Sequence, residues 1–138
     1  MKRQLATLSM AGGLLCLFGT GASAQSYKLA SNVPFAFQVS DQSCASGKYT
    51  VEKPVGHDYQ ILRSKGGCAL ILGYGAPLSG KSQPKLIFHR YNDQYFLSEI
   101  WSDNGTGSRL SVSKGEQKAR EQAQEEMATT TLYLASRR

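Results

Sequence analysis

The sequence is poor in the residues that carry most enzyme chemistry. It has two histidines and three cysteines in 138 residues, and no two cysteines form a C-x-x-C pair. No serine lies in the G-x-S-x-G pattern of a nucleophile elbow. A structural zinc site lacks its usual ligands. We therefore expect no catalytic residues, no metal, no cofactor and no enzymatic activity.

The two histidines are the candidates for acid–base chemistry near neutral pH. His57 stands beside Asp58 near an expected strand start, which is typical of a solvated turn. His89 lies on a mostly apolar strand face, where a hydrogen-bonded histidine at the rim of the core is the usual role. An enzyme would need one of them beside a carboxylate in an open cleft.

The chain also lacks the roughly 20-residue apolar run that spans a bilayer. Its most apolar stretch, residues 5–19, is shorter and contains three glycines. Lys2-Arg3 precedes this stretch and Ala22-Ser23-Ala24 follows it, the three parts of a cleavable signal peptide. We expect residues 1–24 to be removed and the protein to be exported to the periplasm or the extracellular space, with no transmembrane segment.

The mature part, residues 25–138, is long enough for a single domain with a core. It holds all ten acidic residues and fourteen of the sixteen basic ones, a net charge of +4. This excess could favour an anionic envelope polymer as partner, or it could serve solubility alone. No motif of a nucleic-acid-binding fold is present, and export removes that ligand.

Two cysteines remain after the leader, Cys44 and Cys68. An even number in an oxidising compartment predicts a disulfide. Two unpaired thiols are the alternative, because spacing alone does not bring the two Cβ atoms within bridging distance.

Apolar and polar residues alternate with a period of two, in short segments between turn residues. The pattern predicts a mainly β domain of about seven strands, an antiparallel barrel or sandwich. Ser113 and Glu116 form a capping box that predicts a helix over residues 114–127, before the last strand. The expected strands are residues 33–39, 47–52, 58–63, 67–72, 85–91, 94–101 and 129–134.

The strongest local signal is a hairpin of residues 85–91 and 94–101. Asn92-Asp93 predicts a two-residue type I′ turn, because both residue types tolerate positive φ. Apolar residues on both faces indicate a central hairpin. Glu99 is expected on the face of Arg90, as its ion-pair partner. The pairs that follow from this turn are Arg90–Tyr95, His89–Phe96, Phe88–Leu97 and Ile87–Ser98.

One motif is misleading. Residues 75–82 read GAPLSGKS and fit the phosphate-binding pattern G-x-x-x-x-G-K-[ST]. That loop needs a helix to begin at Lys81-Ser82. Because the following residues 85–91 read as a strand, we interpret the segment as an ordinary loop.

The aromatic residues are the one positive indication of a ligand. With an arginine, three of them could stack on a sugar or a peptide, although a core with a polar fringe explains them as well. A non-enzymatic envelope or secreted binding domain is therefore the leading hypothesis, its partner an envelope polymer or a protein. The alternative is a periplasmic hydrolase inhibitor that acts through residues 73–83. The candidate ligand-binding residues are Arg90, Tyr91, Tyr95 and Trp101.

Three segments carry a resemblance. They are PFAF at residues 34–37, SGKYTV at 46–51 and FHRYNDQYFL at 88–97. The chain resembles a group of short bacterial exported proteins with PF-x-F, AG-x-Y-x-V and FHRY-x-D-x-YFL motifs, followed by a charged helix. Ser46 replaces the alanine of that pattern, and Cys44 stands where leucine is expected. The resemblance implies export and the same β-rich fold, but it does not supply a function.

Overall fold

The computed structural model describes residues 28–54, 56–57, 59–66, 69–72, 76–124 and 126–136. The expected signal peptide, residues 1–24, lies outside these residues. Cys68 also lies outside them, so the expected Cys44–Cys68 disulfide stays a prediction. Cys44 itself is buried.

The first sheet has five strands in the order β12-β1-β4-β5-β6, all antiparallel. Alternation sends one set of side chains inward and the other outward. In β4, for example, Tyr49 and Val51 are buried while Lys48 is exposed. The strands are β1 (Lys28–Val33), β4 (Gly47–Glu52), β5 (Gln60–Ser64), β6 (Ala69–Leu72) and β12 (Ala135–Ser136).

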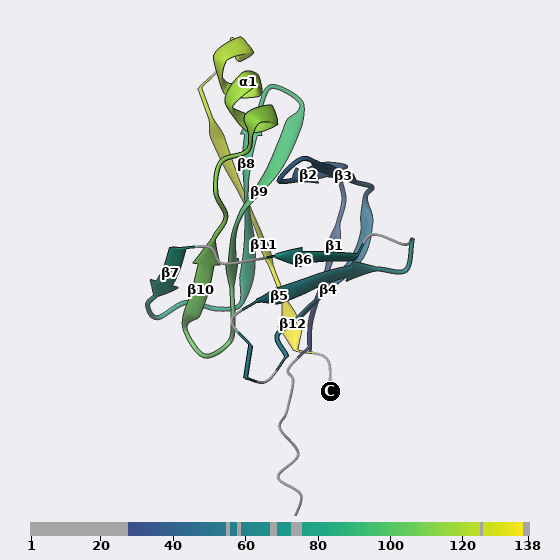
Figure 1. Cartoon of the computed structure of the whole chain (residues 1–138), viewed down its shortest axis with the longest axis vertical. Helices are drawn as coiled ribbons and strands as arrows, with labels where there is room; N and C mark the ends of the chain where they lie inside the picture. Colours follow the sequence, from purple (N-terminus) through teal and green to yellow (C-terminus); the bar gives the residue numbers. More distant parts are fainter. Residues whose placement is uncertain are drawn as a thin grey trace, which may run out of the picture.

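The second sheet has the order β11-β8-β9-β10-β7, and β2 joins it by a short parallel pairing with β9. The helix α1 (Lys114–Gln122) lies at the tip of the β8–β9 hairpin, as Figure 1 shows. The strands are β2 (Phe37–Val39), β3 (Gln42–Cys44), β7 (Ala76–Ser79), β8 (Lys85–Tyr91), β9 (Gln94–Trp101), β10 (Thr106–Arg109) and β11 (Ala128–Tyr133).

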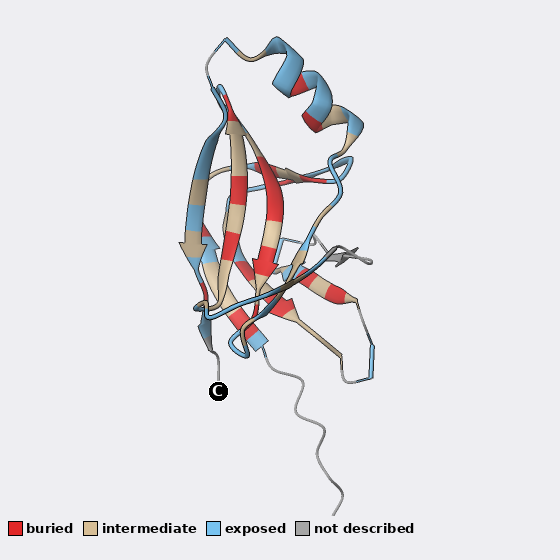
Figure 2. Cartoon of the chain, turned by 90° about the vertical axis from the view of Figure 1, so that its left-hand side faces the viewer, coloured by how far each residue is buried: buried red, intermediate tan, exposed pale blue. Residues whose placement is uncertain are grey.

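The main core lies between the two sheets. Figure 2 shows that buried residues concentrate on the strands, whereas α1 is mostly exposed. Both sheets keep open edges within the described residues, so the sandwich, and not the barrel, is the correct alternative. The mainly β fold with one helix before the last strands is confirmed. The buried residues of this core are Leu29, Val33, Phe37, Val39, Cys44, Tyr49, Val51, Leu62, Leu86, Phe88, Leu97, Ile100 and Leu134.

The central hairpin follows the expected register at its tip and departs from it below. Arg90–Tyr95, His89–Phe96 and Phe88–Leu97 pair as expected. A β-bulge between Ile87 and Phe88 then pairs Ile87 with Glu99, so the expected Ile87–Ser98 pair is wrong. The extra residue Ser98 reverses the alternation in the rest of β9. Ile100 therefore faces the core beside Leu97.

The turn of this hairpin is not type I′. Asn92 has a φ of 53°, but Asp93 is not among the residues with positive φ. A type I′ turn needs positive φ at both positions. Asparagine is one of the few residues other than glycine that adopt positive φ readily, and in this turn Asn92 alone does so.

Two expected elements are shorter than the sequence pattern indicates. The strand expected over residues 33–39 is broken between Val33 and Phe37, where Pro34 has no N–H for a ladder. The helix ends at Gln122, not at residue 127, and Ala123 is already extended. The next three residues of the sequence, Gln124, Glu125 and Glu126, supply no apolar side chain for a longer helix to bury.

A substitution at Phe88 tests whether the β8–β9 hairpin is central to the core. It is fully buried and meets the rings of Phe35 and Phe37 edge-on, at 5.1 and 5.2 Å between centroids. Phe88→Ala is expected to lower the free energy of unfolding by about 3–5 kcal/mol, because it leaves a cavity. Tyr133→Ala, at a residue that is 64% exposed, should change it by less than about 0.5 kcal/mol. Urea unfolding measures both, and equal losses would contradict a central hairpin.

Candidate functional site

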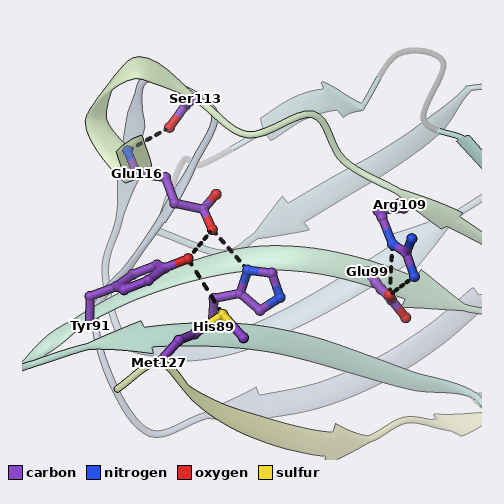
Figure 3. Close-up of polar contacts among 7 residues, drawn as sticks. All are labelled: His89, Tyr91, Glu99, Arg109, Ser113, Glu116 and Met127. Carbon is purple, nitrogen blue, oxygen red and sulfur yellow. Dashed lines mark hydrogen bonds and ion pairs between the residues drawn. The ribbon is translucent and has the colours of Figure 1, made fainter. Parts of the chain in front are cut away.

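The first candidate site is a polar cluster beneath helix α1. Ser113 caps the helix, and its Oγ accepts a hydrogen bond from the backbone N–H of Glu116 at 3.1 Å. This is the expected half of the capping box. The Glu116 side chain does not complete the box. It points toward the β8–β9 hairpin instead, as Figure 3 shows.

The Glu116 carboxylate joins the helix to strand β8. Its Oε1 lies 2.8 Å from Nδ1 of His89 and accepts a hydrogen bond from the Tyr91 hydroxyl at 3.2 Å. An ionised carboxylate only accepts, so Nδ1 of His89 carries the proton in this contact. The Tyr91 hydroxyl also lies 3.5 Å from the sulfur of Met127. The Glu116 side chain is 6% exposed, so these contacts replace water that it has lost.

The environment of Tyr91 reflects this burial. Burial raises the pKa of the Tyr91 phenol above its ordinary value of 10.0, and the negative charge and hydrogen bond of Glu116 raise it further. Arg120 on the same helix opposes this effect. The phenol therefore stays protonated as a donor to Glu116 throughout the physiological pH range.

A histidine that a carboxylate orients could act as a general base through its free nitrogen. The His89 side chain is 25% exposed. Among the described residues, however, Nε2 of His89 has no hydrogen-bonded hydroxyl or thiol to activate. The cluster instead fastens a helix that is otherwise polar: Ala119 is buried against Tyr91 and Phe96, and Ala123 packs beside them.

Removing the charge of Glu116 tests this fastening. Glu116→Gln is expected to lower the free energy of unfolding by about 1.5–3 kcal/mol, the range for hydrogen bonds to a charged group. Amide exchange in α1 should accelerate more than exchange in β4. Glu121→Gln, on the exposed face of the same helix, is the matched control. Unchanged exchange in Glu116→Gln would contradict the fastening role.

A second polar group lies lower on the same face of the sheet. Arg109 of β10 donates to Oε1 of Glu99 through Nε and Nη2, at 2.9 and 2.8 Å, and the Trp101 indole N–H donates to Oε2 at 2.8 Å. The expected partner of Glu99, Arg90, is wrong. The bulge turns Glu99 away from the Arg90 face, and Arg90 lies beside Asp93 at 3.8 Å.

These contacts set the ionisation of Glu99. Burial by itself would raise the pKa of Glu99, but the hydrogen bonds from Trp101 and Arg109 and the charge of Arg109 lower it below its ordinary value. A carboxyl whose pKa is lower in the folded state stabilises the protein above its ordinary pKa. That stability is lost as the pH falls through the folded pKa.

Arg109→Ala is expected to raise the pKa of Glu99 toward its ordinary value of 4.5. Carbon-13 NMR titration of the Glu99 carboxyl measures this directly. The variant should also lose less stability than the wild type between about pH 5 and pH 3, because less of its stability depends on ionised Glu99. The control is Arg63→Ala, which removes an equal charge from the other sheet. An equal rise in the pKa of Glu99 in this control would contradict the pairing of Glu99 with Arg109.

The candidate ligand-binding residues do not gather in one place. Tyr91 is buried under α1, while Tyr95 lies on the opposite face, stacked on Phe35 at 3.8 Å between ring centroids. Arg90 lies over the Tyr95 ring at 5.8 Å. Trp101 is at the far end of β9, with Lys85 over its ring at 5.5 Å. A shared ligand surface of these side chains stays a prediction.

The second candidate site is a groove on the outer face of the five-stranded sheet, of about 560 Å³. Its floor follows from the strand register: Ala135, Ala30 and Thr50 lie side by side on β12, β1 and β4. Small side chains in one row, with long ones on either side, make a trough across the strands. Thr50 in turn lies beside Arg63 on β5.

The rim of the groove is basic. Lys28 and Arg63 lie 2.9 and 3.7 Å from the two oxygens of Glu52, which sits between them. Lys48 and Lys65 are exposed on the other side, and no described carboxylate pairs with either. Continuing the β4–β5 register by one residue places Lys48 and Lys65 opposite each other. Like charges in that position are unfavourable in the absence of an anion.

Sequence reasoning missed this groove. The alternation in Gly47–Glu52 already placed Lys48, Thr50 and Glu52 on the outward face. What it could not supply was the alignment of β1 and β5 beside that strand.

The other residues that the sequence suggested for a site are His57 and residues 73–83. The ring of His57 lies beside that of Tyr59, tilted by 35° with 5.0 Å between the centroids, and no described acidic side chain forms an ion pair with it. Within residues 73–83, Ala76–Ser79 form β7 and pair with β10, so this part is not a free loop. No helix begins at Lys81-Ser82, and the following residues enter β8, which confirms that the phosphate-loop motif is misleading.

No family model matches the chain, and no curated protein or solved structure is significantly similar to it. Among the described residues, no group of three or more histidine, cysteine or acidic side chains could hold a metal ion. Within the same residues, α1 is far too short and polar to cross a bilayer.

Proposed function

We propose that this protein is an exported, non-enzymatic binding domain that holds an anionic envelope ligand in the groove on the outer face of β1, β4 and β5. The observation that carries the proposal is the groove itself. It is lined by Lys28, Lys48, Arg63 and Lys65 against the single carboxylate of Glu52.

The charge arrangement supports an anion as the ligand. Lys28 and Arg63 are held by Glu52, so their positions are partly fixed before a ligand arrives. Lys48 and Lys65 are held by no described acid, and a bound anion between them would remove their mutual repulsion. The leader-like N-terminal sequence would bring the domain to a compartment where anionic polymers are abundant.

The polar cluster under α1 supports the same proposal indirectly. Its carboxylate is almost completely buried and is engaged by His89 and Tyr91. These side chains therefore act within the fold, and the open, charged surface is on the other sheet.

The double variant Lys48→Ala/Lys65→Ala is expected to weaken binding of a polyanion by about 2- to 30-fold, since each exposed ion pair contributes roughly 0.2–1 kcal/mol. Isothermal titration calorimetry with polygalacturonate and with polyphosphate at low ionic strength measures the loss. Binding should also weaken as salt rises, because the Debye length falls from about 10 Å at 0.1 M to about 3 Å at 1 M.

The control is Lys81→Ala/Lys118→Ala, which removes two exposed charges away from the groove and should bind as the wild type does. Equal losses in both double variants would mean that net charge alone attracts the polymer. Failure of every polyanion to bind the wild type at any salt would overturn the proposal.

A further inference from the structure

We infer that the ligand of the outer groove is an acidic polysaccharide, a chain that carries both carboxylates and free hydroxyls. The inference rests on the proposed function and adds the chemical class of its ligand. It follows from the neutral and acidic side chains that share the groove with the four cations.

The groove offers hydrogen-bonding groups that a simple polyanion cannot use fully. Asn32 and Thr50 lie at outward positions of β1 and β4 and line it together with the basic side chains. Amides and hydroxyls both donate and accept hydrogen bonds. A sugar hydroxyl does the same, whereas a fully ionised phosphate chain supplies acceptors alone.

Glu52 also favours a sugar chain over a phosphate chain. Its side chain is 22% exposed, between Lys28 and Arg63, and it lines the groove. Toward a ligand without hydrogen-bond donors, this carboxylate is simply repulsive. Toward a sugar chain, it is an acceptor for a hydroxyl, because a carboxylate has about four lone-pair sites and the two cations leave some of them open. A carboxylate among cations therefore fits a ligand that has both acids and hydroxyls.

The shape of the surface favours a chain over a single acidic sugar. A second groove, of about 600 Å³, lies between residues 42–49 and the turn at residues 64–66. It shares Lys48, Tyr49, Ser64 and Lys65 with the first groove. The two hollows thus adjoin along the lysine pair, so an extended ligand would cross both lysines and occupy both sides.

Three oligomers of equal length separate charge from hydroxyl content: oligogalacturonate, its methyl ester and linear polyphosphate. In calorimetry at low ionic strength, oligogalacturonate should bind about tenfold tighter than either of the others, the effect of one charge-assisted hydrogen bond. Galacturonate monomer should bind far more weakly than the oligomer.

Variants of the groove give opposite signs for the two kinds of anion. Glu52→Gln should weaken oligogalacturonate binding severalfold and strengthen polyphosphate binding, because it replaces a charged acceptor for a sugar hydroxyl by a weaker neutral one and removes a charge that repels phosphate. Thr50→Val should weaken oligogalacturonate binding more than polyphosphate binding, because a phosphate chain can use this hydroxyl as a donor alone. Thr129→Val, at an exposed threonine on β11, is the matched control and should change neither. Circular dichroism confirms that each variant is folded.

The outcomes distinguish a wrong ligand class from a wrong proposed function. If polyphosphate binds as tightly as oligogalacturonate and Glu52→Gln strengthens both, the ligand is not an acidic polysaccharide, although an anion-binding groove stands. If neither polyanion binds, or if the methyl ester binds as well as the acid, the proposed function is wrong as well.

Discussion

One extra residue in β9 decides which side chains of this strand face the core and which face outward. The bulge opposite Ile87 and Phe88 lets Leu97 and Ile100 both enter the core, although their spacing would place them on opposite faces of a regular strand. The same reversal turns Glu99 and Trp101 outward. A regular strand would have placed a carboxylate in the core, where an unpaired charge is costly.

The hairpin is consequently buried on two sides by different partners. Phe88 and Leu97 face the five-stranded sheet, whereas Tyr91 and Phe96 lie under α1. The helix contributes little apolar surface of its own, so a buried carboxylate with two donors from β8 supplements its packing. This division commits the outer face of the β8–β9 hairpin to holding the helix.

Among the residues that the structure describes, none covers the groove of the five-stranded sheet in this way. There the short side chains of Ala30 and Thr50 sit beside each other across β1 and β4, and long basic side chains rise around them. The proposed ligand surface is thus a product of cross-strand neighbours. Lys65, in the turn after β5, adds the last of its four basic side chains.

The sequence by itself determined the period-two strands, the hairpin tip from Phe88 to Leu97 and the capped start of the helix at Ser113. These features depend on neighbours in the chain, through alternation, turn conformation and the first turn's free N–H groups. Only the tertiary structure decided the bulge, the partners of Glu99 and Glu116, and the groove. Each of these depends on which strand lies beside which. The spacing of Lys28, Glu52 and Arg63 along the chain carries no information about that pairing, because three separate strands bring them together.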